Sequence, residues 1–345
     1  MLLMILSAGI ITTCYAQSVH TDSIDYKMVY GMGLKADVTP IITYLDTVNP
    51  VTEKDVKFKS QFLSRFKYQT EESALPDGTD KDILSLYRNF ETYWRKSMLR
   101  PDINRDGIFL NRLTKFLESL NKKQSFTNEP VTAENLEGAF RRFVDSKGLH
   151  TTDFGKTGKF YDLLLWSTEV PEEYPVQLID TAVRVTVYFM DDFVSLGWLE
   201  YVRMGASFPG GWATEEGLYC VRKGYDLSSE KFLINFLKHE AQHFADRGRY
   251  EKLPAHRLEY RAKLIELHFC EKTLYKTLET FIRTAKDDPS NAHPFANHHI
   301  VRNLSEKIFS ADFVTDLSRW EEVPGEDIQK AAQLLYLEDT ALLPE

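Results

Sequence analysis

Residues 230–244 read EKFLINFLKHEAQHF, and this stretch decides the fold that the rest of the chain must build around it. Apolar side chains recur at helical spacing on both sides of its His-Glu-x-x-His segment, and Ser229 precedes it as an N-cap residue. On a helix, His239 and His243 lie on one face about 6 Å apart, with Glu240 beside them. We therefore predict a buried helix that presents two imidazoles and one carboxylate to the interior.

The His-Glu-x-x-His pattern is typical of a catalytic zinc site. Two imidazoles one helical turn apart can bind the same tetrahedral ion, and the carboxylate between them can act as a general base. Such groups are costly to bury unless a metal or hydrogen bonds satisfy them. The pattern predicts that His239 and His243 bind one Zn²⁺ per chain and that Glu240 activates a water molecule. The alternative is a helix with two solvent-exposed histidines.

A catalytic zinc needs a third protein ligand, and the sequence after His243 offers candidates. Gly248 ends the first helix between two arginines, and Pro254 opens a second helix. That second helix carries Glu259 and Glu266, seven residues apart on one face. Either glutamate could complete the site.

Two further residues near the motif are candidates as well. Asp246 lies three residues after His243 on the same helical face. We expect Asp246 to orient a ligating imidazole, because such histidines usually donate their other N–H to a carboxylate or a carbonyl. His256 lies three residues before Glu259 and is either close to the site or on the surface.

These residues resemble the gluzincin clan of zinc peptidases, in which a His-Glu-x-x-His helix is paired with a downstream helical glutamate. In the large aminopeptidases of this clan the second helix reads E-x-x-A-x-x-x-E with the first glutamate on zinc, and Glu259, Ala262 and Glu266 match that pattern. The resemblance implies that Glu259 is the third zinc ligand and that the chain is a zinc metallopeptidase. It covers residues 239–266, and the 15 residues between His243 and Glu259 are fewer than the clan usually has.

The resemblance also implies a group that stabilises the oxyanion of the reaction. Thermolysin-like enzymes use a histidine from a later segment, and the aminopeptidases use a tyrosine. Residues 291–299 are rich in histidine and asparagine, and we expect a loop there with His293 or His298 in this catalytic role. Tyr260 is another candidate. Solvated surface histidines are the alternative for this stretch.

The chain has a strand-like pattern before the metal-binding helix. Residues 182–189 alternate apolar and polar side chains, residues 198–204 are rich in aromatic and β-branched side chains, and residues 212–222 follow a Pro-Gly-Gly turn. We predict strands in all three. Residues 217–221 are expected at the sheet edge, where an extended peptide substrate could pair with them, with a central strand as the alternative.

The earlier part of the chain is predicted to be mostly helical, with helices over 83–99, 111–120 and 133–144. Residues 102–107 imitate the first half of a calcium loop, but Leu113 stands where a bidentate glutamate is required. We therefore expect a capping turn there.

The predicted organisation is an α+β fold with a zincin-like core, in which a small sheet precedes the two metal-binding helices. We assign a signal peptide to residues 1–16, a mostly helical N-terminal region to 17–150, the zincin-like core to 151–285, and a histidine-containing loop with C-terminal helices to 286–345.

The first 16 residues predict export, because they are largely apolar, carry no charge and end in small residues. The expected location is secreted or periplasmic. Cys14 raises the alternative of a lipoprotein, but Thr13 does not fit the consensus before a lipidated cysteine. No later stretch approaches the roughly 18 apolar residues of a transmembrane helix. The remaining cysteines, Cys220 and Cys270, could pair in an oxidising compartment.

The net charge of −9 argues against a nucleic-acid partner, and the expected partner is a peptide or protein substrate. Two alternatives to a peptidase stay open at this point. One is a non-catalytic exported protein whose motif is coincidental or holds a structural zinc. The other is a zinc amidohydrolase that acts on a non-peptide substrate. Composition does not distinguish an exopeptidase from an endopeptidase, nor does it give the oligomeric state.

Overall fold

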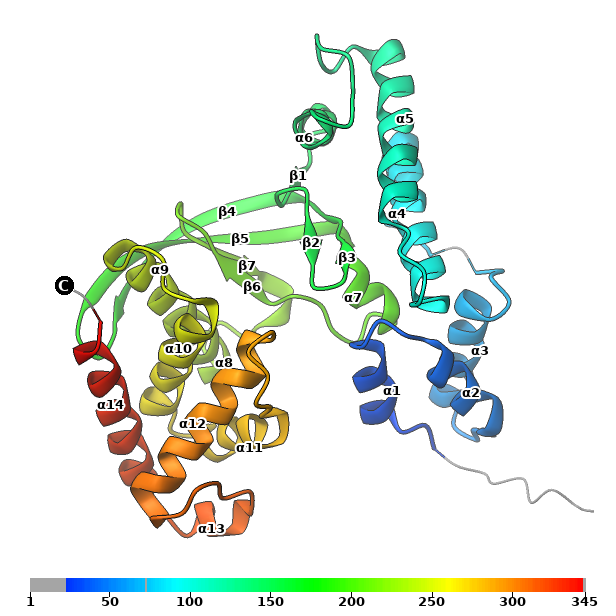
Figure 1. Cartoon of the computed structure of the whole chain (residues 1–345). Helices are drawn as coiled ribbons and strands as arrows, with labels where there is room; N and C mark the ends of the chain where they lie inside the picture. Colours follow the sequence, from blue (N-terminus) through cyan, green and yellow to red (C-terminus); the bar gives the residue numbers. More distant parts are fainter. Residues whose placement is uncertain (1–22, 72, 344–345) are drawn as a thin grey trace, which may run out of the picture. The chain divides into compact units, whose positions relative to one another are not determined.

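The computed structural model describes residues 23–71 and 73–343, which combine helices with one curved sheet (Figure 1). The expected mixed α+β class is confirmed. The proposed signal peptide and Cys14 lie outside the described residues. The chain divides into two compact units, each assembled from several stretches of sequence. The first comprises Met1–Phe116, Gly155–Asp162 and Gly197–Ser207, and the second comprises Leu117–Phe154, Leu163–Leu196 and Phe208–Glu345.

The first unit is mainly helical. Its elements are α1 (Tyr26–Gly33), α2 (Thr39–Thr47), α3 (Glu53–Phe66), α4 (Lys81–Leu99), the start of α5 (Asp106–Gln124), β2 (Lys156–Thr157), β3 (Phe160–Tyr161) and α7 (Gly197–Val202). Trp94 of α4 is fully buried and donates its indole N–H to the carbonyl oxygen of Tyr161 at 2.8 Å. This contact joins α4 to β3 within an aromatic core, and the indole N–H is satisfied inside that core.

The predicted helices of the N-terminal region are confirmed, since they correspond to α4, α5 and α6 (Leu136–Ser146). The capping turn predicted before α5 is also present. Asn104 Oδ1 accepts a hydrogen bond from the backbone N–H of Asp106 at 2.8 Å, and α5 begins there.

The strand predicted over residues 198–204 is wrong, because this segment forms the short helix α7. Trp198, Tyr201 and Val202 are all buried, and their spacing of three and four residues is that of a helix face. Gly197 begins the helix at φ +86°, a conformation that favours glycine. Asp162 Oδ1 accepts from the backbone N–H of Trp198 at 2.8 Å and so caps the helix.

The second unit contains a five-stranded sheet in the order β1-β4-β5-β7-β6. The strands are β1 (His150–Thr151), β4 (Leu164–Gln177), β5 (Ala182–Leu196), β6 (Gly211–Ala213) and β7 (Leu218–Val221). β5 and β7 are parallel, and the other neighbours are antiparallel. β4 and β5 form a long curved hairpin (Figure 1). The strand predicted over residues 182–189 is therefore confirmed as part of β5.

The edge strand was predicted at the wrong position. Residues 212–222 do not form one strand, because Thr214 and Gly217 close a turn with an N–H···O bond of 2.8 Å between β6 and β7. β7 lies between β5 and β6, so residues 217–221 are inside the sheet. The edge strands are β1 and β6, and β6 contacts α9.

Helices of the second unit cover one face of this sheet. They are α8 (Glu230–Phe232), a π-helical segment (Leu233–Lys238), α9 (His239–Arg249), α10 (Ala255–Phe269), α11 (Leu274–Thr284), α12 (Ala292–Phe309), α13 (Leu317–Glu321) and α14 (Gly325–Ala341). Alternate residues of β5, namely Val185, Val187 and Phe189, are buried in the core that these helices form. The loop expected at residues 291–299 is wrong, because α12 begins at Ala292.

Cys220 and Cys270 are both buried and both free, so the pairing considered from the sequence does not occur. Within the part of the chain that the structure describes, no helix is both long and apolar enough to cross a membrane.

Candidate metal centre

The helix that carries the two histidines begins upstream of them and contains a widened turn. Ser229 caps it, since its hydroxyl accepts a hydrogen bond from the backbone N–H of Phe232 at 3.3 Å. The π-helical segment Leu233–Lys238 then leads into α9. Such segments are rare and occur frequently at functional sites. The predicted buried helix is confirmed, because His239 and His243 are only 7% and 5% exposed.

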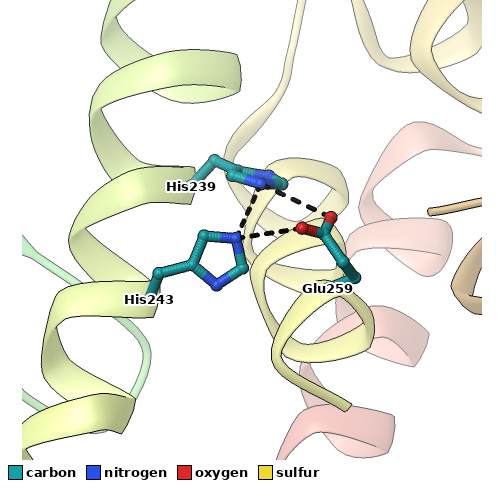
Figure 2. Close-up of side chains that lie close together, drawn as sticks. All are labelled: His239, His243 and Glu259. Carbon is teal, nitrogen blue, oxygen red and sulfur yellow. Dashed lines mark hydrogen bonds and ion pairs between the residues drawn. The ribbon is translucent and has the colours of Figure 1, made fainter. Parts of the chain in front are cut away.

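Two imidazoles and one carboxylate converge between α9 and α10 (Figure 2). The Nε2 atoms of His239 and His243 are 3.1 Å apart. Oε1 of Glu259 lies 3.3 Å from Nε2 of His243, and Oε2 lies 3.7 Å from Nε2 of His239. The donor atoms of all three residues lie within 4.8 Å of one another. The structure therefore brings together the three residues that we predicted as metal ligands.

The separations between these donors can be compared with those around a tetrahedral ion. Bonds of about 2.0–2.1 Å from zinc to nitrogen and oxygen place neighbouring donors about 3.3 Å apart. The three separations in the cluster, 3.1, 3.3 and 3.7 Å, lie around that value. Two imidazoles and one carboxylate also leave a fourth position open for water. The three donors are thus close enough together to share one metal ion.

Glu266 holds the first imidazole from its other side. Its Oε1 lies 2.6 Å from Nδ1 of His239, and its Oε2 accepts a hydrogen bond from the side-chain amide of Asn235 in the π-helical segment. Nδ1 of His239 therefore carries the proton, and its Nε2 presents a lone pair towards His243 and Glu259. The sequence offered both glutamates as the third ligand. Glu259 lies beside both Nε2 atoms, whereas Glu266 contacts Nδ1 of His239.

The charges of the cluster also favour a bound cation. Burial opposes ionisation of Glu259, yet hydrogen bonds from His243 and His293 and the nearby imidazole of His239 hold the pKa of Glu259 far below its usual range. Burial likewise opposes the charging of His239, but the hydrogen bond to Glu266 and the surrounding carboxylates raise its pKa. A buried site that already prefers ionised carboxylates beside imidazoles is suited to a dication.

Asp246 does not orient an imidazole, so that expectation is wrong. Its Oδ2 accepts a hydrogen bond from Nε of Arg261 at 2.8 Å, and both side chains are fully buried. Arg261 also donates to the hydroxyl of Tyr336 at 2.8 Å and to Asp339 Oδ2 at 3.1 Å. Asp246 therefore serves a buried ion-pair network that joins α9, α10 and α14, because the guanidinium is the stronger partner for its charge.

Glu240, the predicted general base, is half-buried beside His239 at the start of α9. The negative charge of Glu240 also affects the phenol of Tyr225. Burial raises the pKa of the Tyr225 phenol well above its usual range, and Cys220, Glu240 and Glu266 add to the rise. Tyr225 therefore keeps its proton at neutral pH and can act as a hydrogen-bond donor near Glu240.

The two histidines predicted from residues 291–299 lie in different surroundings. His293 is 64% exposed, and its Nδ1 is 2.8 Å from Oε2 of Glu259. It therefore joins the cluster from the first turn of α12. His298 instead stacks on the ring of Phe313 with 5.0 Å between centroids, and no contact among the described residues links it to the cluster.

The remaining candidates lie on the side of α10 that faces α12. The hydroxyl of Tyr260 accepts a hydrogen bond from the side-chain amide of Asn303 at 3.0 Å. The imidazole of His256 meets the ring of Phe295 edge-on at 5.4 Å. Both residues therefore line a space next to the cluster and do not contribute donors to it.

Sequence reasoning missed the supporting roles of Glu266 and Asn235. The seven-residue spacing from Glu259 was the available signal for Glu266, since it places both carboxylates on one face of α10. Asn235 had no such signal, because a regular α-helix would not predict the widened turn that carries it. Comparison with known proteins gives no further guide, since no family model, curated protein or solved structure matches the chain.

Proposed function

We propose that this chain is a zinc-dependent peptidase in which His239, His243 and Glu259 bind the ion and Glu240 is the general base. The observation that carries the proposal is the convergence of the three donors at 3.1 to 3.7 Å, with Glu266 behind His239. Buried imidazoles that face each other at this distance are better satisfied by a shared cation than by each other. We also propose that the protein is exported.

The protein side chains divide the work of peptide hydrolysis among them. Zinc in such a site lowers the pKa of water to near 7 and polarises a carbonyl group. Glu240 accepts the proton that the attacking water loses and passes it to the amine that leaves when the C–N bond breaks. His293 lies at the exposed side of the cluster with Nδ1 against Glu259, and in its doubly protonated form it donates from Nε2 to the developing oxyanion.

The sheet edge supports a peptide as the substrate. β6 is an edge strand, and Arg247 of α9 donates to the carbonyl oxygen of Ala213 in β6 at 2.9 Å. This contact keeps β6 against α9, the helix that carries His239 and His243. The carbonyl of Ala213 is already engaged, and an extended peptide could add through main-chain hydrogen bonds to the remaining part of this edge. This feature favours a peptidase over an amidohydrolase of small non-peptide substrates.

Metal content tests the ligand set. We expect one zinc per chain in the wild-type protein purified without chelators and strong loss of zinc in Glu259→Ala. Glu251→Ala is the matched control, because Glu251 is an exposed glutamate in the turn before α10. Wild-type protein without zinc under these conditions would refute the site.

Activity tests the role of the base. Glu240→Gln is expected to keep zinc and to lose at least about a hundredfold in peptide hydrolysis, since general bases contribute 10²–10⁴-fold. His243→Ala should lose both zinc and activity. Equal hydrolysis by wild type and Glu240→Gln would exclude the mechanism. Zinc without any hydrolysis in the wild type would favour the structural-zinc alternative.

A further inference from the structure

A cavity of about 560 Å³ lies between α10, α12 and α14. Phe295 and Ala296 of α12, Leu335 of α14 and Leu342 just after α14 give it apolar walls. Polar and charged groups also line it, among them Asn303, Arg257, Glu338 and Asp339. Cavities of this size that combine apolar walls with polar groups are typical of binding sites.

The cavity begins within one helical turn of the metal cluster. On α10, Tyr260 directly follows Glu259, and His256 precedes it by three residues. On α12, Phe295 is two residues after His293, whose Nδ1 is 2.8 Å from Oε2 of Glu259. Because a helix rises about 1.5 Å per residue, these steps are only a few ångströms along each axis. A peptide held at the cluster can therefore reach the cavity with one side chain.

Three rings form one wall of the cavity. The ring of Phe295 lies between the imidazoles of His256 and His299, with centroid distances of 5.4 and 4.3 Å and interplanar angles of 87° and 71°. Edge-to-face arrangements of this kind extend naturally to a further aromatic ring. The wall is therefore better suited to an aromatic side chain than to an aliphatic one.

His299 adds a polar atom that lacks a partner. Its Nε2 is buried and has no hydrogen-bond partner among the described residues. Its Nδ1 lies 3.5 Å from a guanidinium nitrogen of Arg302. Because a guanidinium only donates, Nδ1 accepts and Nε2 carries the proton. A buried N–H without an acceptor is unfavourable. Because Nε2 has almost no accessible surface, the imidazole has to turn towards the cavity before a phenolic oxygen there can accept from it.

We propose that this cavity holds an aromatic side chain of the bound peptide, with tyrosine favoured over phenylalanine through Nε2 of His299. The proposal rests on the peptidase function above and adds the substrate class. The aromatic ring would pack on Phe295, and the side chain in the cavity would decide which peptides the centre hydrolyses efficiently.

The test uses the zinc-loaded full chain and a set of short peptides, with blocked or free ends, in which one position is varied among Ala, Leu, Phe and Tyr. Cleavage sites and kcat/KM are measured by mass spectrometry. Wild type is expected to prefer Tyr and Phe over Ala at one position by at least about tenfold. Ala296→Leu, which narrows the cavity, should remove most of that preference. Ala292→Leu, one turn earlier on α12 and outside the cavity, should retain it.

His299→Phe is the second variant, because it keeps the ring and removes the N–H. We expect it to keep the aromatic preference and to remove the advantage of Tyr over Phe. Cleavage with a preference that neither Ala296→Leu nor His299→Phe alters would overturn this inference and leave the peptidase function standing. Absence of cleavage of every peptide by the wild type would overturn the peptidase function itself, and this inference with it.

Discussion

At the scale of single residues, the contact between Glu266 and His239 sets the orientation of one of the two candidate ligand imidazoles. The 2.6 Å separation between Oε1 and Nδ1 fixes the tautomer of the imidazole before any ion arrives. Asn235 holds the second oxygen of Glu266, so the carboxylate cannot turn away. His239 is therefore the better ordered of the two imidazoles, because Nδ1 of His243 is buried without a hydrogen-bond partner among the described residues.

Substitution of Glu266 should weaken metal binding without removing a ligand. We expect Glu266→Leu to raise the dissociation constant for zinc by about 10–100-fold, the usual cost of losing a carboxylate that supports a ligating histidine. Glu266→Gln should lose less, because its amide oxygen can still accept from Nδ1. Competition with a chelator measures both values. Glu279→Gln, at an exposed position on α11, is the control, and an unchanged affinity in Glu266→Leu would contradict the role.

The two buried thiols should be unreactive in the folded protein. Burial raises the pKa of Cys220 to about 12 and that of Cys270 to about 11, so the thiolate is scarce at neutral pH. We expect iodoacetamide to modify neither cysteine at pH 7.5 until a denaturant is added, as read by mass spectrometry of the peptides that contain them. Fast labelling of native protein, or a disulfide between the two, would contradict this assignment.

The donor atoms of the site could be predicted from residue types and spacing, and their supports could not. His239, His243 and Glu259 were identified because the i, i+4 spacing and the downstream helix restrict where ligands can lie. Asp246 was expected to support an imidazole, since it shares the helical face of His243. The partner that it takes instead, Arg261, lies 15 residues away on another helix, and no local pattern indicates that pairing.

At the scale of elements, the junction of α9, α10 and α14 depends on the buried charge of Arg261. The guanidinium binds Asp246, Asp339 and the hydroxyl of Tyr336. That hydroxyl also donates to Oδ1 of Asp180, in the turn between β4 and β5. One cation thus ties three helices to the sheet within the second unit.

Removal of this cation should destabilise the fold strongly. Arg261→Met leaves Asp246 buried without a countercharge, and breaking a buried pair in this way costs about 3–5 kcal/mol. Urea denaturation measures the free energy of unfolding. The double variant Arg261→Met/Asp246→Leu should recover part of the loss, because both charges are then absent.

Lys122→Met is the matched control, because Lys122 forms an exposed i, i+4 pair with Glu118 and should change stability little. An Arg261→Met variant as stable as Lys122→Met would show that the network contributes no net stability.

Three elements differ from their prediction for identifiable reasons. The aromatic composition of residues 198–204 favoured a strand, but the spacing of its buried side chains is helical, as in α7. The polar histidine-rich start of α12 concealed the buried positions of residues 296–304 that face the core. β4 was not predicted, because it contains Pro171, Pro175 and several glutamates. A strand paired with β5 over most of its length, and with β1 only at its start, tolerates prolines on its open side.

At the scale of the whole molecule, the free energy of metal binding should appear as thermal stability. The donors come from two helices that are brought together only by folding, so zinc bound as proposed would stabilise the native state. At a thousandfold excess over the dissociation constant this stabilises by about 4 kcal/mol.

We expect zinc to raise the unfolding temperature by on the order of 10 °C, given roughly 2–4 °C per kcal/mol for domains of this size. Differential scanning calorimetry measures the shift. His243→Ala should show none, and Mg²⁺ should have little effect on the wild type, because it prefers octahedral oxygen ligands. An equal shift in His243→Ala would place the stabilising ion elsewhere.

The chain passes five times between the two compact units, since each unit is assembled from three separate stretches of sequence. This arrangement has an evolutionary consequence. A single recombination event at any point of the gene would divide at least one unit, so the unit that carries the candidate metal site cannot be exchanged as an independent cassette. We expect the two units to have evolved together in one intact chain. Homologous chains should therefore contain both units.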